Sequence, residues 1–281
     1  MGYKRIVPLV TAPERKIFIK KKQKNNGWVG FMANPFLFLS KSIFLIYNLY
    51  MRNIKYFIGI DEVGRGPLAG PVTVAVVATT VNLKFKIQNA ELKIKKKSAN
   101  SKFLILNSKL AKLRDSKKLS PAQREKWFKW IKENKNLRYA VASVSPKVID
   151  KINITKAANL AATRALKRLI QNSEFRIKNC RIYLDGGLYL NKISINQRNQ
   201  HLSAVTIIKG DEKIPVIMLA SIIAKVTRDR KMIRLHKEYP KYSFNEHKGY
   251  GTKRHIGAIR KYWPSEIHRL TFVKSYYKVK K

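Results

Sequence analysis

Acidic residues are scarce in this sequence, and four of them follow segments with the composition of β-strands. Asp61 and Glu62 come after one apolar run, Asp185 after a second and Asp211 after a third. Carboxylates at the ends of adjacent strands can converge on one point, where their hard oxygen atoms suit Mg²⁺ or Mn²⁺ better than a zinc-type site. Four like charges brought together also need a cation to compensate them. The spacing therefore predicts a divalent-metal site at one edge of a sheet.

A metal site of this kind has a defined chemistry. In a two-metal centre, with the ions about 3.5–4 Å apart, one ion activates a water molecule and the other stabilises the leaving oxygen of a phosphodiester. This reaction requires no serine or histidine nucleophile, and the sequence shows no arrangement of Ser, His and Asp that would favour one. Taken singly, an Asp beside Gly is often only a turn residue. The pair Asp61-Glu62 resists that interpretation, because two adjacent acids after a strand stabilise nothing unless a cation lies on them.

The net charge indicates a polyanionic partner. The 281 residues include 60 Lys and Arg against 16 Asp and Glu, a formal charge of +44. A positive potential of this size attracts nucleic acids, although ribosomal proteins, chromatin proteins and proteins from A·T-rich genomes also accumulate lysine. The single cysteine, Cys180, excludes an internal disulfide and a Cys-rich zinc site. We expect it in the core next to a strand, in a protein of the reducing cytoplasm.

The segments around these acids predict an α/β fold. The predicted strands are residues 56–60, 72–81, 139–144, 181–184 and 202–208. The predicted helices are residues 120–134, 156–170 and 215–236. Ser120, Pro121 and Gln123 give the first helix a hydroxyl N-cap, a proline at its first position and a capping box. The alternation of strands and helices indicates a mixed sheet with helices packed on it.

The N-terminal residues include an apolar stretch that resembles a membrane anchor. Residues 35–50 are mostly apolar, but Lys41 interrupts them and leaves only about half a bilayer span on either side. No small-residue cleavage site of a signal peptide follows. We expect residues 1–55 to be a poorly ordered extension without stable membrane association. The alternatives are a true anchor, or upstream sequence translated from a wrongly chosen start codon with Met51 as the real start.

Residues 59–71, GIDEVGRGPLAGP, closely resemble the opening signature of bacterial ribonuclease HII. Five later segments resemble further blocks of this family in the same order: residues 115–120, 184–186, 209–211, 220–229 and 247–252. The resemblance implies a ribonuclease H-like mixed β-sheet flanked by helices, with a helical C-terminal part. Residues 56–238 would form the catalytic domain, and residues 239–281 a basic helical cap.

The resemblance also implies an activity and a cofactor. Asp61, Glu62, Asp185 and Asp211 would form the catalytic set and hold Mg²⁺ or Mn²⁺, with two ions during catalysis. The enzyme would be an endonuclease that hydrolyses the RNA strand of RNA–DNA hybrids. It would also nick duplex DNA 5′ of embedded ribonucleotides, leaving a 3′-hydroxyl and a 5′-phosphate. Its partners would be these duplexes, and we expect it to act as a monomer.

A turn next to the acids resembles the family element that reads ribose. Gly64-Arg65-Gly66 matches the motif by which ribonuclease HII recognises the 2′-hydroxyl at an RNA–DNA junction, and ribonuclease HIII relatives lack this Arg. Glycines allow the backbone to approach the sugar closely, and backbone groups can hydrogen-bond the hydroxyl that distinguishes RNA from DNA. Tyr250 matches the family tyrosine that contacts the same hydroxyl and stacks on the next sugar.

Several further residues are candidates for phosphate contacts. Three consecutive residues are assigned to phosphates near the cut: Ser116, Lys117 and Lys118. A basic loop of this kind can also be merely solvated. Lys225 and Arg228, on the long predicted helix, could face the nucleic acid backbone as well. Asp229 lies between Arg228 and Arg230, so we expect it in a helix-surface ion pair rather than in the metal site.

The chain departs from the family pattern in its loops. Asp185 is followed by two glycines where the family usually has a polar residue after the first. The link at residues 191–200 is long and polar, and the Lys-rich insertion at residues 84–113 is longer than usual. These departures leave the four carboxylates in place.

Two other classes of function remain open. A non-catalytic nucleic-acid-binding protein would bind with strong salt dependence and show no metal-dependent turnover; the intact set of four acids argues against it. A different nuclease on the same fold, such as a junction resolvase, does not explain the combination of Gly64-Arg65-Gly66 with Tyr250. The sequence therefore favours a ribonuclease of type HII.

Overall fold

The computed structural model describes residues 17–22, 28–33, 54–80, 113–171, 180–190 and 204–277. The chain divides into two compact units, Met1–Asn53 and Ile54–Lys281. The described backbone of the first unit is an antiparallel pair of strands, β1 (Ile17–Lys22) and β2 (Trp28–Ala33). The apolar stretch at residues 35–50, the link at 191–200 and all of the predicted insertion except Leu113 lie outside the described residues. The predicted boundaries of the extension and the cap stay predictions.

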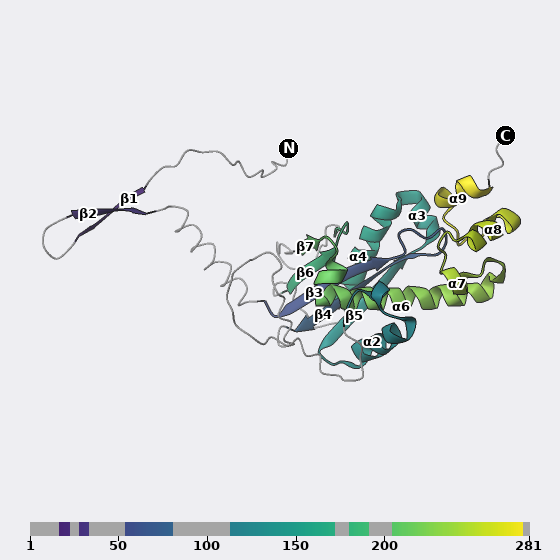
Figure 1. The fold of residues 1–281 in the computed structure, drawn as a ribbon, viewed down its shortest axis with the longest axis horizontal. Helices are drawn as coiled ribbons and strands as arrows, with labels where there is room; N and C mark the ends of the chain where they lie inside the picture. The colour runs from purple at the N-terminus through teal and green to yellow at the C-terminus, as the bar shows by residue number, and fades with distance from the viewer. Residues whose placement is uncertain are drawn as a thin grey trace. The chain divides into compact units, whose positions relative to one another are not determined.

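The second unit is built on a mixed sheet, which has five strands within the described residues (Figure 1). The strands are β3 (Tyr56–Val63), β4 (Val72–Thr80), β5 (Leu137–Val144), β6 (Cys180–Asp185) and β7 (Ala204–Ile207). They lie in the order β5-β4-β3-β6-β7. Neighbours among β5, β4 and β3 are antiparallel, whereas β6 is parallel to both β3 and β7. The C-terminal ends of β3, β6 and β7 therefore meet at one edge of the sheet.

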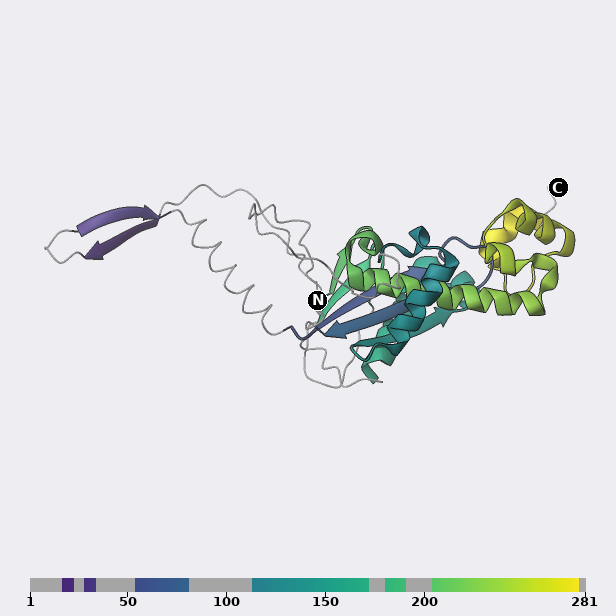
Figure 2. The same cartoon turned by 60° about the horizontal axis from the view of Figure 1, so that its bottom comes forward.

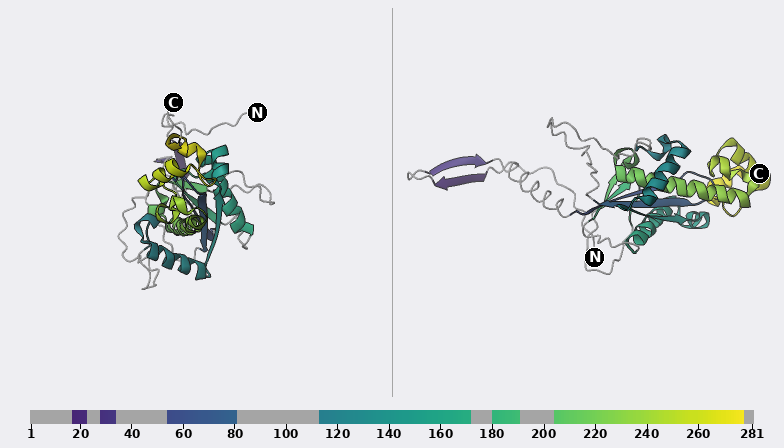
Figure 3. Two further views of the ribbon diagram at one scale, coloured as in Figure 1. Left: turned by 90° about the vertical axis from the view of Figure 1, so that its right-hand side faces the viewer. Right: turned by 90° about the horizontal axis from the view of Figure 1, so that it is seen from below.

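Helices cover both faces of this sheet (Figure 3). The α-helices are α2 (Pro121–Glu133), α3 (Pro146–Ile152), α4 (Ile154–Gln171), α5 (Gly210–Lys213), α6 (Pro215–Glu238), α7 (Phe244–His247), α8 (Lys253–Tyr262) and α9 (Leu270–Tyr277). Two short 3₁₀ helices are η1 (Ser116–Lys118) and η3 (Pro240–Tyr242). Alternate residues of β4, such as Val74 and Val76, share one apolar cluster with the alanine-rich side of α4. Because side chains alternate along a strand, the residues between them face α6 on the other side.

The central strands are buried on both faces, which explains their composition. Val72–Thr80 is apolar or β-branched throughout, and every residue from Val72 to Thr79 is buried. A strand covered on both sides loses the polar-outward alternation of a half-exposed strand. Gly59 on β3 serves the same packing, because a Cβ atom there would lie 2.4 Å from the backbone carbonyl of Val216. The glycine allows α6 to lie directly against the sheet.

The C-terminal part is helical and packs on the loop that follows β3. Helix α6 continues past the sheet to α7 and the last helices of the chain (Figure 2). Ala69 of the loop joins a small apolar cluster with Met232 and Phe244, and Leu68 joins another with Ile259 and Val273. The second part of this loop, residues 67–71, is thereby enclosed between the sheet and the C-terminal helices.

The predicted fold class is confirmed by this architecture. Each predicted strand and helix is present, with ends that differ by no more than a few residues. The capping box predicted for α2 is also present, since Ser120 accepts from the Gln123 N–H and the Gln123 side chain accepts from the Ser120 N–H. Helices α3 and α5 and the 3₁₀ helix η1 were not predicted. Among the described residues, every helix is too short or too polar to cross a membrane.

We predict that Gly59→Ala destabilises the protein by about 1–3 kcal/mol or more, the range for overpacking a closed interface. The added methyl group would collide with the Val216 backbone, which cannot rotate away as a side chain can. Gly257→Ala in α8 is the matched control. Nothing lies within 4 Å of a Cβ atom at Gly257, so the same change should stabilise the helix by about 0.5–1 kcal/mol. Urea unfolding measures both values, and equal stabilities of the two variants would contradict this packing.

Candidate active site

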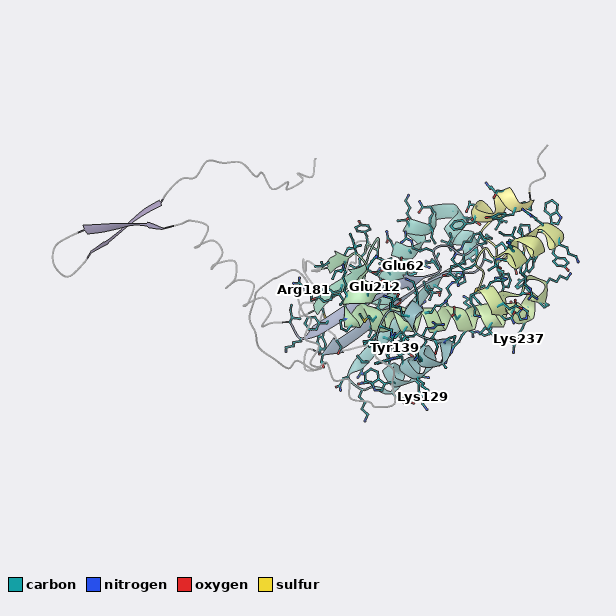
Figure 4. All side chains as sticks on the ribbon, in the orientation of Figure 1. Glu62, Lys129, Tyr139, Arg181, Glu212 and Lys237 are labelled. Carbon is teal, nitrogen blue, oxygen red and sulfur yellow. The ribbon has the colours of Figure 1, made fainter. Side chains whose placement is uncertain are left out.

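The acidic residues singled out in the sequence gather at the C-terminal edge of the sheet. Asp61 and Glu62 lie near the end of β3, and Asp185 is the last residue of β6. The last parallel pair of β3 and β6 is Ile60 with Leu184, so Asp61 and Asp185 are adjacent one step further on. Figure 4 labels Glu62 in this region, together with Glu212 on α5. The topology alone thus brings together groups that are 124 positions apart in sequence.

Three carboxylates share one small volume. Asp61, Glu62 and Asp185 each offer an oxygen atom, and these three atoms lie within 4.8 Å of one another. Asp211, in α5 directly after β7, lies beside this cluster, because the Asp211 and Gly210 N–H groups both donate to Asp185 Oδ1, at 3.4 and 2.7 Å. The predicted convergence therefore holds for three acids, with the fourth next to them.

Backbone geometry fixes the orientation of these acids. Asp61 Oδ1 accepts a 2.7 Å hydrogen bond from the Glu62 N–H. A Cβ atom at Gly210 would lie 2.5 Å from Ile217 Cδ1 and 3.3 Å from Asp185 Oδ1, so a side chain there would displace Ile217 and crowd the Asp185 carboxylate. The departure from the family pattern after Asp185 also has a local reason. Gly187 has φ of +85°, a left-handed conformation that glycine adopts without strain.

The electrostatics of the cluster are unfavourable without a cation. Burial raises the pKa of Asp61 well above its ordinary value, and repulsion from Glu62 and Asp185 adds to the increase. Burial also raises the pKa of Glu62 to about 7, although Arg65 opposes the rise. The pKa of Asp185 is raised by burial first and then by Asp211. Each of these shifts reports an anion that lacks sufficient positive charge around it.

The donor set fits a hard divalent cation. All the converging atoms are carboxylate oxygens, the ligands that Mg²⁺ and Mn²⁺ prefer. Glu62 Oε2 is buried and has no hydrogen-bond partner among the described residues. Two basic side chains each hold one oxygen of the acidic group, since Arg65 lies 3.2 Å from Glu62 Oε1 and Lys117 lies 3.1 Å from Asp211 Oδ2. Both are residues that the sequence assigned to substrate.

The Gly64-Arg65-Gly66 turn follows β3 directly and borders the acids. Gly64 has φ of +91°, and a Cβ atom there would lie 2.3 Å from the Arg228 side chain. Gly66 is exposed, with open space where a side chain would be. The Arg65 guanidinium reaches back to Glu62 and also donates to Thr155 on α4. The first glycine is therefore required by packing, and the second leaves the outer face of the turn uncovered.

Tyr250 lies next to this turn although it is distant in sequence. The carbonyl of the preceding residue, Gly249, accepts hydrogen bonds from the N–H groups of Leu68 and Ala69 at 2.8 and 3.3 Å. The Tyr250 carbonyl accepts from His255 Nδ1 at 2.9 Å. Tyr250 as a whole residue stays 40% exposed. Backbone hydrogen bonds thus join the segment just before Tyr250 to the residues that follow the turn.

The three predicted phosphate contacts form η1, and they have different surroundings. Ser116 is buried, and its hydroxyl lies 2.8 Å from that of Ser221 on α6. Lys117 and Lys118 are exposed and pair with Asp211 and Glu212.

Ser221 was not singled out in the sequence, yet its hydrogen bond to Asp61 lowers the pKa of that acid and opposes the effect of burial.

One expectation about α6 was wrong. Arg228 does not face solvent or a nucleic acid backbone, because its side chain is fully buried and donates to backbone carbonyls. Lys225 is mostly buried and pairs with Asp229 at 2.9 Å. The predicted helix ion pair of Asp229 is therefore present, with the lysine one turn earlier in place of the flanking arginines.

Comparison with known proteins identifies close relatives. The family model described as ribonuclease HII matches residues 58–112 and 100–278. Ribonuclease HII of Caldicellulosiruptor bescii is 40% identical over 221 residues, which cover 79% of this chain and 88% of that protein.

Solved structures share the fold. Ribonuclease H2 of Pyrococcus horikoshii superposes with a TM-score of 0.55 at 24% identity, covering 79% of this chain and 96% of that one. Ribonuclease HII of Archaeoglobus fulgidus, solved in a complex with PCNA, gives a TM-score of 0.50 at 25% identity over 80% and 96% of the two chains.

We predict that the metal-free protein loses stability as the pH rises through the titration of Glu62. The ordinary pKa of a glutamate is 4.5, and burial raises that of Glu62 to about 7, so the folded state binds the proton more tightly than the unfolded state. Protonation therefore favours folding, and the stability falls between these pH values. In EDTA, Glu62→Gln should be more stable than wild type at pH 8 by about 1–3 kcal/mol.

This difference should shrink once the pH falls below about 4, because Glu62 is then mostly protonated in both the folded and unfolded states. Denaturant unfolding at several pH values provides the measurement. A difference between wild type and variant that does not change with pH would show that Glu62 is not a buried, destabilised anion.

Proposed function

The chain belongs to the ribonuclease HII family of endoribonucleases, which cut RNA in RNA–DNA hybrids, and on this premise we propose a more specific activity. The enzyme nicks duplex DNA on the 5′ side of single embedded ribonucleotides as well as cutting hybrids, and it leaves a 3′-hydroxyl and a 5′-phosphate. One observation carries the proposal. Three carboxylates, one buried and two half-buried, have oxygens within 4.8 Å of one another and border an open turn, Gly64-Arg65-Gly66.

The divalent cations would be held by Asp61, Glu62 and Asp185. Asp211 would become a further ligand once its ion pair with Lys117 is broken. Mg²⁺ or Mn²⁺, two ions during catalysis, would supply charge compensation for the phosphodiester and lower the pKa of the attacking water. The protein contributes the fixed positions of the acids, which the paired ends of β3 and β6 hold before substrate arrives.

Arg65 and Lys117 act on the substrate phosphates in this proposal. Each now neutralises one carboxylate at the centre. Divalent cations would replace them in that role and leave both side chains to attract the anionic backbone of the duplex. Lys118 attracts the same backbone. Ser116 is buried and acts indirectly, because its hydrogen bond to Ser221 anchors η1 to α6.

Recognition of ribose rests on the open turn and on Tyr250. The exposed Gly66 lets the backbone approach a sugar closely. Tyr250 offers a partly exposed aromatic ring beside the turn, and it would contact the 2′-hydroxyl and stack on the next sugar. We further propose that the protein works in the cytoplasm as a monomer, on duplexes drawn to its net charge of +44.

We predict that Asp61→Asn lowers the rate of nicking by about 100-fold or more, a loss of about 2.7 kcal/mol in transition-state stabilisation. The assay uses a duplex with one ribonucleotide in Mg²⁺, beside an all-DNA duplex that should remain uncut. Glu133→Gln is the matched control, because Glu133 is an exposed acid of α2 paired only loosely with Lys129.

Asp61→Asn should still bind the duplex, since it removes one negative charge and no phosphate contact. Binding follows from fluorescence anisotropy. Nicking by Asp61→Asn at a rate within tenfold of wild type, or cleavage of the all-DNA duplex by wild type, would refute the proposed activity.

A further inference from the structure

Two arginines of this protein are buried completely, which is rare for charged side chains. Arg228 lies on α6, and Arg269 lies directly before α9. Both have 0% exposure. Together they donate six hydrogen bonds to backbone carbonyls, and five of the six carbonyls belong to the loop at residues 64–71.

Arg269 holds the first part of this loop. Its Nη2 donates to the Gly64 carbonyl at 2.5 Å, and its Nη1 donates to the Arg65 carbonyl at 2.8 Å. Its Nε donates to the Gly70 carbonyl at 3.1 Å. One planar guanidinium thus fixes both ends of the loop, which the rigid fork of an arginine can do and the single ammonium of a lysine cannot.

Arg228 joins the same loop to the segment that carries Tyr250. Its Nε donates to the Pro71 carbonyl at 2.9 Å and its Nη2 to the Ala69 carbonyl at 3.1 Å. Its Nη1 donates to the Lys248 carbonyl at 2.9 Å. The side chain also packs against the Cα atom of Gly64, where a Cβ atom would collide with it. The turn and Tyr250 are therefore set at a fixed separation by one side chain.

The direction of these carbonyls determines where the amide groups of the turn point. In a trans peptide the C=O of one residue and the N–H of the next point in opposite directions, and none of the described peptide bonds is cis. The Gly64 and Arg65 carbonyls point inward to Arg269, so the Arg65 and Gly66 N–H groups point outward. Neither N–H donates to an acceptor within the described part of the chain. Two successive donors are left facing the substrate side.

The charge of the two arginines supports this arrangement. Burial, with repulsion from Arg228 as the second cause, lowers the pKa of Arg269 to about 9. Two buried cations close together are unfavourable unless well-made hydrogen bonds or a nearby anion compensate them. The carbonyls supply the hydrogen bonds. A negatively charged sugar-phosphate chain lying on the turn would supply the anion.

We propose that Arg269 and Arg228 are positioning residues for ribose recognition. Arg269 aims the N–H groups of Arg65 and Gly66 at the 2′-oxygen of the ribonucleotide, and Arg228 sets Tyr250 at the matching distance. This inference rests on the proposed function, because it assumes that the turn reads ribose. It assigns part of the sugar specificity to residues that never touch the substrate.

The test measures how much more tightly the protein binds a duplex with a ribonucleotide than an all-DNA duplex, in a variant that does not cleave either. Asp61→Asn protein, alone and combined with Arg269→Lys or Arg228→Lys, is titrated with a duplex containing one ribonucleotide and with the same duplex in all-DNA form. Arg269→Lys should reduce the preference for the ribonucleotide by about tenfold, the effect expected from misdirecting one or two hydrogen bonds. Affinity for the all-DNA duplex should stay the same. Arg230→Lys is the matched control, because Arg230 is an exposed arginine of α6 paired with Glu125.

Each outcome assigns a role. Thermal unfolding and Mn²⁺ binding in the Asp61-intact forms show whether the fold and the acidic centre survive each substitution. An unchanged preference in folded variants, or an equal loss of affinity for both duplexes, would overturn the proposal. Failure of both variants to fold would also overturn it, by giving the arginines a purely structural role. If Asp61→Asn alone shows no preference for the ribonucleotide, the proposed function fails instead.

Discussion

The crowding of carboxylates at partly buried positions is the constraint on which the rest of this structure depends. Folding brings Asp61, Glu62 and Asp185 together, and burial first and mutual repulsion second raise the pKa of each. Arg65 and Lys117 compensate the acidic group only in part. An arrangement of this kind destabilises the metal-free protein and becomes favourable when divalent cations bind to the carboxylates. The pairing of β3 with β6 maintains it by holding the acids on a rigid sheet.

Charge of the opposite sign is buried close to these acids in space, although it comes from a distant part of the sequence. The turn after β3 has acids on one side, and Arg228 and Arg269 lie beneath it. These arginines come from the C-terminal helices and their surroundings, so the last part of the chain is needed to shape the loop next to the metal site. The acidic cluster would act on the phosphodiester, and the braced turn would read the sugar beside it.

The sequence predicted the features that depend on local pattern. Apolar periodicity located the strands, the capping box located α2, and the acids after three strands indicated a metal site. The contacts of Arg269 could not be predicted, because they join residues about 200 positions apart and need the tertiary arrangement of a loop. Arg228 was misassigned for a related reason. Arginine on a helix is usually exposed. The sequence around Arg228 does not show that three backbone carbonyls from distant segments accept its hydrogen bonds.

The central claim is that Asp61, Glu62 and Asp185 together hold a catalytic divalent cation, and crystals soaked in Mn²⁺ test it most directly. Anomalous scattering locates manganese without reference to activity. The account predicts a strong peak within bonding distance of oxygens from all three carboxylates, with Arg65 displaced from Glu62. Manganese bound elsewhere, with the Arg65–Glu62 ion pair intact and no peak among the three acids, would contradict it.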